Sequence, residues 1–229
     1  MKLKNIVICS FIGLGFAISS CKQDNYPVPN AGIQGAITDA ATGSQIQTEQ
    51  PNGIKIRLIE TKYGNNVTPN DFWCRANGSF ENTQVFAGRY KVVPIEGAFF
   101  PADTAIVDVS GLTTVNFKVT PYLTITANVT AVAGGVNTSY TISRTKAGDK
   151  ITTARTLVSA YPTVSNTINE FSTSNDLSGI EDNVILGKQY ADAITGLTSG
   201  KTYYVRVAAR TANANNKFNY SEAVKIIVP

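Results

Sequence analysis

The sequence predicts an all-β protein built from two consecutive β-sandwich domains. Short runs in which apolar and polar residues alternate, such as Ile54 to Leu58, are typical of half-buried strands. Turn signals rich in Gly, Asn and Asp separate these runs about every 8–12 residues, which is the spacing of a sandwich. Hydrophobic residues make up 43% of the chain, enough to fill the cores of both domains.

The first 20 residues are predicted to be a secretion signal. Lys2 and Lys4 precede an apolar run from Ile6 to Ile18. This run is shorter than the roughly 20 apolar residues that a membrane-spanning helix needs. Cleavage of 20 residues from 229 leaves a mature chain of 209 residues.

Residues 18–21, Ile-Ser-Ser-Cys, resemble the lipobox of bacterial lipoproteins. The resemblance implies that Cys21 becomes the lipidated N-terminus and that acyl chains hold the protein to a membrane. Residues 21–31 are then the lipidated cysteine and a flexible tether, polar and with two prolines. The alternative is a plain signal peptide followed by an unmodified cysteine.

Charge and composition exclude several functions. Without Lys2 and Lys4 the mature chain has 18 basic and 16 acidic residues. This small excess of positive charge does not indicate nucleic-acid binding, which requires Lys and Arg clustered on one face. The sequence has no histidine, so Ser-His-Asp and Cys-His catalysis and the usual zinc sites are excluded. We therefore expect no enzyme activity, no cofactor and no metal.

The three cysteines predict no disulfide within the mature chain. Once Cys9 is removed with the leader and Cys21 is lipidated, Cys74 has no disulfide partner, and we expect it to be a small buried hydrophobic residue.

Residues 32–120 form the first predicted sandwich. Strands are expected near residues 33–37, 54–58, 89–94, 104–109 and 114–119. A Gly-x-Ile-x-Asp-Ala-x-Thr-Gly motif at residues 35–43, Asn-Gly-Ser-Phe at 77–80 and Phe-Ala-Gly-Arg-Tyr at 86–90 resemble the carboxypeptidase regulatory-like, or transthyretin-like, sandwich. That resemblance implies a structural module without catalytic residues.

Residues 121–229 form the second predicted sandwich. Residues 194–209 resemble the fibronectin type III signature, in which a Leu ends one strand, a Gly turn follows and a Tyr opens the next strand. The resemblance assigns Tyr203 to a tyrosine corner, where its hydroxyl bonds to upstream backbone. Residues 150–190 fit the pattern less well, which leaves an Ig-like relative as the alternative.

Three further motifs resemble a family of two-domain Bacteroidetes outer-membrane lipoproteins. They are Gln-Thr-Glu-Gln-Pro-Asn-Gly at 47–53, Asp-Phe-Trp-Cys at 71–74 and Gly-Ala-Phe-Phe-Pro at 97–101. The resemblance implies a cell-surface role beside SusC/SusD-like nutrient importers of the kind used in polysaccharide utilisation. It carries no assigned biochemistry.

The loop over residues 61–73 is the first candidate binding site. Tyr63, Asn65, Asp71 and Trp73 supply the flat aromatic faces, amides and carboxylates that sugar binding uses. The alternative is that Trp73 and Phe72 pack into the sandwich, where most aromatic side chains are buried.

Phe99 and Phe100 are the second candidate site. Adjacent residues of a strand face opposite ways, so one of the two rings is expected to be exposed to a partner. The alternative is that the chain bends here and buries both. Residues 103–105, Asp-Thr-Ala, match a short O-glycosylation pattern of exported Bacteroidetes proteins, which makes Thr104 the candidate acceptor.

Acidic residues near position 180 are not predicted to be functional. Glu181 and Asp182 have no second carboxylate placed across from them, as a glycosidase requires. The cluster of Asp176, Glu181, Asp182 and Asn183 lacks the regular spacing of a calcium loop.

The sequence therefore predicts a non-catalytic surface lipoprotein of the outer membrane. Its leading role is as an accessory component of a SusC/SusD-type importer that holds glycan substrate, the importer, or both. The alternative is a structural or adhesive lipoprotein that makes only protein–protein contacts.

Overall fold

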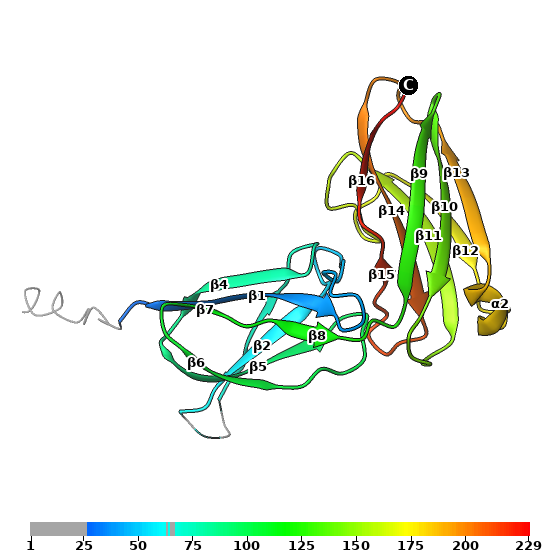
Figure 1. Cartoon of the computed structure of the whole chain (residues 1–229). Coiled ribbons are helices and arrows are strands. Elements are labelled where there is room, and N and C mark those ends of the chain that lie inside the picture. Colours follow the sequence, from blue (N-terminus) through cyan, green and yellow to red (C-terminus); the bar gives the residue numbers. More distant parts are fainter. Residues whose placement is uncertain (1–26, 63, 65–66) are drawn as a thin grey trace, which may run out of the picture.

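The computed structural model contains two packed β-sandwiches joined end to side (Figure 1). It describes residues 27–62, 64 and 67–229. The predicted leader, Cys21, Tyr63 and Asn65 lie outside the described residues. No helix in the described part of the chain is long and apolar enough to cross a membrane.

Over the described residues, the N-terminal sandwich contains eight strands in two sheets. One sheet has the order β4-β1-β7, with β8 also paired to β1, and the other has the order β3-β2-β5-β6. The bounds are β1 (Ala31–Asp39), β2 (Lys55–Glu60), β3 (Asn70–Trp73), β4 (Ser79–Val85), β5 (Gly88–Glu96), β6 (Ala105–Val109), β7 (Leu112–Thr114) and β8 (Phe117–Val119).

The C-terminal sandwich contains the remaining strands and one short helix. Its sheets have the orders β13-β10-β9 and β12-β11-β14-β15, with β16 also paired to β14. The bounds are β9 (Thr124–Val132), β10 (Gly135–Ser143), β11 (Ile151–Ser159), β12 (Phe171–Asp176), α2 (Asp182–Leu186), β13 (Gln189–Thr195), β14 (Thr202–Thr211), β15 (Asn219–Tyr220) and β16 (Val224–Ile227).

The order of pairing clarifies the irregular middle of the C-terminal sandwich. Strand β12 pairs with β11, in the sheet of β14, and not with β13. In a constant-type immunoglobulin domain the fourth strand lies in the sheet of the fifth strand, so this arrangement is different. Helix α2 lies between β12 and β13, which explains why the strand spacing over residues 150–190 is irregular.

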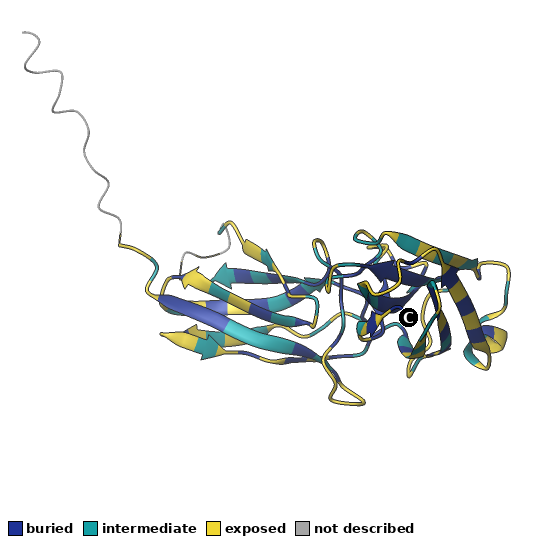
Figure 2. Ribbon diagram, turned by 90° about the horizontal axis from the view of Figure 1, so that it is seen from above, coloured by how far each residue is buried: buried dark blue, intermediate teal, exposed yellow. Residues whose placement is uncertain are grey.

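The cores follow the predicted alternation (Figure 2). In β13, Tyr190, Asp192 and Ile194 point inward and are buried, whereas the residues between them are exposed. Tyr203 is buried, and its hydroxyl accepts a hydrogen bond from the Thr198 amide at 3.4 Å, which confirms the predicted tyrosine corner. Cys74 is fully buried and unpaired, and burial raises the pKa of its thiol to about 12.

The strand expected over residues 114–119 is divided in the structure. Strand β1 pairs in parallel with β7 through Gln34 and with β8 from Ile37. Between them, the Val115 amide donates to the Gln34 carbonyl and the Asn116 side chain accepts from the Ala36 amide. The division at residues 115–116 therefore separates β7 from β8 without a change of register along β1, because Gly32 pairs with Leu112 and Ile37 with Phe117.

Candidate functional site

The three motifs at residues 47–53, 71–74 and 97–101 meet at the junction of the two sandwiches. The first follows β1 and precedes β2, the second includes the end of β3, and the third follows β5. Strand β1 runs from the tether end of the N-terminal sandwich to this junction (Figure 1). The motifs are therefore brought together by the fold, although they are separated in the sequence.

Arg206 is the centre of the junction. Its side chain lies in β14 but is only 1% exposed. The guanidinium donates to the carbonyl oxygens of Thr48 (2.9 Å) and Ser221 (2.7 Å) and to the side-chain oxygen of Gln47 (3.0 Å). Longer bonds reach the carbonyl oxygens of Val164 and Ala76. Burial lowers the pKa of Arg206 to about 10, so the group remains charged near neutral pH.

Tyr220 and Glu49 complete this buried network. The Arg206 guanidinium lies over the Tyr220 ring, 4.5 Å from its centroid. The Tyr220 hydroxyl donates to a carboxylate oxygen of Glu49 at 3.1 Å, and the Thr167 hydroxyl donates to the same oxygen. Burial and the neighbouring Glu49 charge raise the pKa of Tyr220, so the phenol remains a donor. One cation, one anion and one aromatic ring thus join the two sandwiches.

Phe99 and Phe100 are part of the same junction. Phe99 is 5% exposed, so the expectation that it contacts a ligand or partner is wrong, because the chain bends and buries it against the N-terminal core. Phe100 is half-buried and packs edge-on against Tyr122, with 4.9 Å between ring centroids. The Lys146 ammonium lies over the Phe100 ring, 4.4 Å from its centroid. Both rings therefore hold the junction together.

The residues of the predicted sugar loop are only partly available. Asp71 is held by two hydrogen bonds from Arg57 at 2.8 and 2.7 Å, and these bonds lower the pKa of its carboxyl group. Phe72 packs against the N-terminal core. Trp73 is 36% exposed, but the ammonium groups of Lys55 and Lys217 lie over its ring, 4.3 and 5.4 Å from the centroid. A sugar that stacked on Trp73 would have to displace a lysine.

The remaining candidates are separate from the junction. Tyr63 and Asn65 lie outside the described residues, and so does Cys21. Thr104 is exposed, so its hydroxyl is accessible, and its modification stays a prediction.

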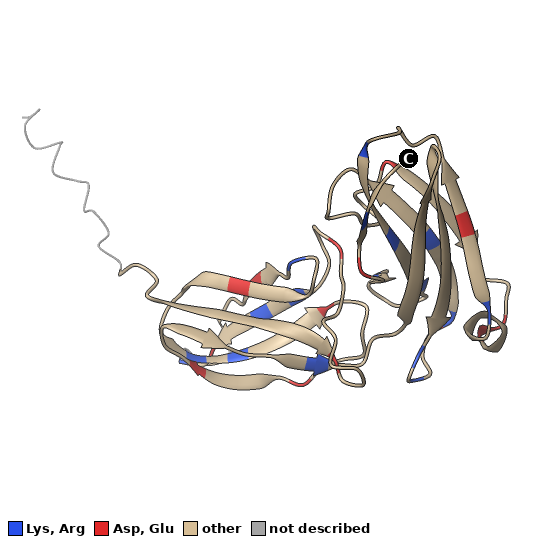
Figure 3. Cartoon of the chain, turned by 45° about the horizontal axis from the view of Figure 1, so that its top comes forward, with Lys and Arg blue, Asp and Glu red and all other residues tan. Residues whose placement is uncertain are grey.

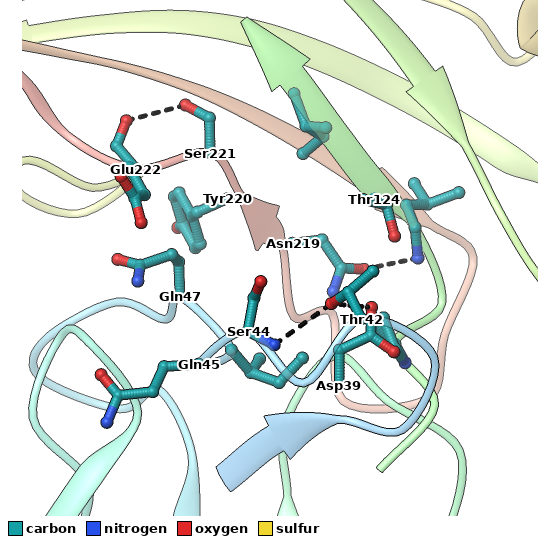
Figure 4. Close-up of a pocket in the computed structure, with 14 residues that line it drawn as sticks. Asp39, Thr42, Ser44, Gln45, Gln47, Thr124, Asn219, Tyr220, Ser221 and Glu222 are labelled. Carbon is teal, nitrogen blue, oxygen red and sulfur yellow. Dashed lines mark hydrogen bonds between the residues drawn. The ribbon is translucent and has the colours of Figure 1, made fainter. Parts of the chain in front are cut away.

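A polar groove lies between the sandwiches beside the Arg206 network (Figure 4). It encloses about 230 Å³. Three separate segments line it: residues 39–47 after β1, residues 121–125 at the connection, and residues 219–222 around β15. No sequence motif predicted this site, because its walls come from segments that are up to about 180 positions apart in the chain.

Part of the groove wall is held in place by internal hydrogen bonds. Asp39 accepts bonds from the Ala41 amide and the Thr42 hydroxyl, which close the turn after β1. Asn219 accepts from the Leu123 amide at 3.0 Å and donates to the Ala98 carbonyl oxygen at 2.8 Å. These side chains position the groove and have little capacity left for a ligand.

Other side chains in the groove retain free polar atoms. The hydroxyls of Ser44 and Thr124, the amide of Gln45 and the carboxylate of Glu222 make no hydrogen bond or ion pair to any other described residue. Gln45, Ser44 and Glu222 are exposed. Hydroxyl, amide and carboxylate groups together suit a neutral, polyhydroxylated or peptide-like ligand, because each group can exchange water for a ligand hydrogen bond.

A second hollow of about 270 Å³ adjoins the first. It is lined by residues that include Asn77, Pro162 and Ala223, and it shares Gln47 and Glu222 with the groove. The polar surface thus continues across the junction, which fits an extended ligand better than a single small one.

Asp182, at the start of α2, is held by neighbouring cations. Asp182 bonds to Lys150 at 3.0 Å and pairs with Arg144 at 3.1 Å. Burial alone would raise the pKa of Asp182, but these cations and the Ile151 amide lower it. Within the described ranges, no three His, Cys, Asp or Glu residues are grouped so that they could hold a metal ion.

The fold and the groove define an all-β module of two sandwiches with a polar junction. Residues 31–120 match the family model described as "Protein of unknown function (DUF3823) N-terminal domain". The matched residues comprise the strands of the N-terminal sandwich, which is therefore similar to this family's N-terminal domain.

Solved structures are similar to this chain over most of its length. A DUF3823 family protein from Bacteroides uniformis is 28% identical and has a TM-score of 0.79; the match covers 88% of this chain and 100% of that one. A second B. uniformis protein, described as a "putative carbohydrate binding protein", is 23% identical, with a TM-score of 0.74 and coverage of 87% and 100%.

A third solved structure extends the likeness to another organism. A DUF3823 family protein from Parabacteroides merdae is 21% identical, with a TM-score of 0.73 and coverage of 87% and 99%. No match was found among the curated proteins. The descriptions of the family and of these three structures name no catalytic activity.

Proposed function

We propose that this protein is a non-catalytic, lipid-anchored binding protein on the outer-membrane surface, accessory to a SusC/SusD-type nutrient importer. It acts by holding a glycan substrate, the importer, or both. The observation that carries the proposal is the polar groove at the junction, with its free hydroxyl, amide and carboxylate groups. A glycan would exchange hydrogen bonds to water for bonds to these groups.

Three observations support the proposal. The lipobox-like residues 18–21 are typical of bacterial lipoproteins. One protein of the same fold is described as a "putative carbohydrate binding protein". Lysine and arginine are interspersed with acidic residues along the ribbons of both sandwiches in Figure 3, whereas nucleic-acid-binding proteins cluster their basic residues on one face.

The alternative is a structural or adhesive lipoprotein that contacts only proteins. The lysines over Trp73 favour it, because their ammonium groups compete with a sugar for the tryptophan ring. The burial of Phe99 in the junction is neutral between the two functions, since a rigid junction serves either.

Recovery of a tagged copy from its own outer membrane tests the importer role. After mild-detergent solubilisation, we expect a SusC/SusD-like pair to co-purify in near-stoichiometric amounts, identified by mass spectrometry. A protein that purifies alone would contradict the importer role. Protease shaving of intact cells is the companion measurement, because a protein protected from protease would contradict its surface location.

Paired variants test which site binds glycan. The double variant Gln45→Ala, Glu222→Gln should weaken binding to a responsive polysaccharide about 10-fold or more, since each lost hydrogen bond is worth about 1 kcal/mol. Trp73→Ala should change affinity less than twofold, because its ring is already covered by lysines. Calorimetric titration measures both. The reverse pattern would place the site at Trp73, and no binding by the wild-type chain across a polysaccharide panel would favour the protein-contact alternative.

A further inference from the structure

Exposed apolar side chains gather where the tether joins the N-terminal sandwich. Val28 is 79% exposed, Phe86 44% and Leu112 52%. Val28 precedes β1, Phe86 follows β4, and Leu112 opens β7. Their strands are neighbours at this end, because Ala31 pairs with Val85 and Gly32 pairs with Leu112. We call Val28, Phe86 and Leu112 the apolar tip.

Hydrogen bonds hold the turns of the apolar tip in place. Asn30 accepts a hydrogen bond from the Ala87 amide at 3.0 Å, which ties the tether to the turn after β4. The Tyr90 hydroxyl donates to the Phe86 carbonyl oxygen at 3.1 Å, and the Gly32 amide donates to the Gly111 carbonyl oxygen at 2.8 Å. These bonds hold the turns in place, so the exposed rings and methyl groups are fixed features of the surface.

The segments that form the tip carry no charge. Residues 27–30 read Pro-Val-Pro-Asn, residues 86–88 Phe-Ala-Gly and residues 110–112 Ser-Gly-Leu. In Figure 3 the ribbon is tan, the colour of uncharged residues, where the tether enters β1. Charges lie beside the tip: Arg89 and Asp108 are 3.9 Å apart and offset each other, and the half-buried Glu60 carboxylate lies next to Gly88. Apolar groups without charge are suited to the boundary between lipid headgroups and acyl chains.

The tether is short compared with the domain. Six residue steps separate Cys21 from Pro27, so the chain can extend at most about 20 Å between them. Strand β1 alone has nine residues and spans about 30 Å. A lipid on Cys21 therefore keeps the apolar tip within reach of the bilayer, whereas the junction at the other end of β1 lies a domain length away.

We propose that the apolar tip docks onto the lipid bilayer that carries the protein's own anchor. This inference rests on the proposed function only for the lipid on Cys21. Docking adds a second contact to the acyl chains, and it sets the direction of the N-terminal sandwich. The polar groove is then held about one strand length, roughly 30 Å, above the membrane surface, where an extended ligand can reach it.

Tryptophan fluorescence in brominated vesicles tests the docking. The chain contains a single tryptophan, Trp73, which lies at the junction and serves as an internal reference. The full chain is purified with its lipid and reconstituted into dioleoylphosphatidylcholine or its dibromo analogue, whose bromine quenches tryptophan on contact. We expect Phe86→Trp to gain a blue-shifted emission that the dibromo lipid quenches, whereas wild-type emission is unchanged.

Two variants control this experiment. Leu112→Trp lies on the neighbouring turn and should be quenched as Phe86→Trp is. Tyr161→Trp is 63% exposed on the C-terminal sandwich and should not be quenched. Equal emission of Phe86→Trp and Leu112→Trp in the two kinds of vesicle would overturn the docking, and it would assign the tip to a protein partner instead.

The lipid itself is tested separately. Intact mass of the purified chain shows whether Cys21 is acylated, and an unmodified mass would contradict the anchor in the proposed function without deciding the docking. In that case the chain is coupled through Cys21 to a maleimide lipid, since Cys74 is buried and unreactive. The quenching comparison is then repeated with the same expected and contradicting results.

Discussion

Replacing Arg206 by methionine should lower the stability of the C-terminal sandwich by about 3–5 kcal/mol and uncouple the two sandwiches. Methionine fills similar space but donates no hydrogen bond. Carbonyl oxygens of Thr48, Val164 and Ser221 would then lose their donor inside the protein. Glu49 would also keep a buried carboxylate without the nearby cation. Each unsatisfied buried group costs about 1–3 kcal/mol.

Thermal unfolding followed by calorimetry measures this effect. We expect one transition for the wild-type chain, because the junction links the sandwiches, and two transitions for Arg206→Met. Arg210→Met is the matched control, since Arg210 lies on the same face of β14 but is half-exposed and only stacks on Phe218. Its loss should cost about 0.5–1 kcal/mol. A single unshifted transition in Arg206→Met would contradict the role of Arg206 in the junction.

Replacing Gly35 by alanine should destabilise the N-terminal sandwich by about 3 kcal/mol or more. A Cβ atom at this position would lie 1.8 Å from the Val115 carbonyl oxygen and 2.7 Å from the Phe80 ring. Gly35 lies where β1 changes its partner from β7 to β8, and Val115 is bonded to Gln34 at the same point. The backbone atoms can therefore move only if the parallel pairing is broken.

Urea unfolding of a graded set of glycine variants isolates this clash. Gly179→Ala should be nearly neutral, because nothing lies within 4 Å of its Cβ position and its φ is ordinary. Gly43→Ala also meets open space but has a φ of +75°, so it should cost about 1–2 kcal/mol. If Gly35→Ala were no worse than Gly43→Ala, then the close approach of Val115 would not constrain this edge of the sheet.

Local pattern in the sequence predicted the fold well. The alternation of apolar and polar residues placed most strands, because each sheet has one buried face and one exposed face. The strand expected at residues 114–119 was divided at residues 115–116, where an Asn116 side chain replaces backbone pairing to β1, and the alternation of apolar and polar residues does not reveal such a break. The burial of Cys74 and the corner role of Tyr203 followed from composition and from a local motif.

The candidate site was predicted poorly, because aromatic residues in a sequence do not reveal their partners. Phe99 was a candidate contact residue and is instead buried in the junction. Trp73 is exposed in part, but Lys217, one of the lysines over its ring, lies 144 positions away. The groove was missed altogether, since none of its three segments has a binding motif of its own.

Arg206 shows which features of the protein can be predicted from the sequence and which cannot. In β14 it alternates with Val205 and Val207, so the period of two assigns it correctly to the outer face of its sheet. On an isolated sandwich that face would meet water and suit an arginine. In the protein, the loop at residues 47–53 of the other sandwich covers it, and its exposure falls to 1%. The sequence by itself thus determined the strands and their two faces, because these depend on neighbouring residues. Only the tertiary structure decided which outer face became an interface, because that depends on contacts between residues more than 150 positions apart.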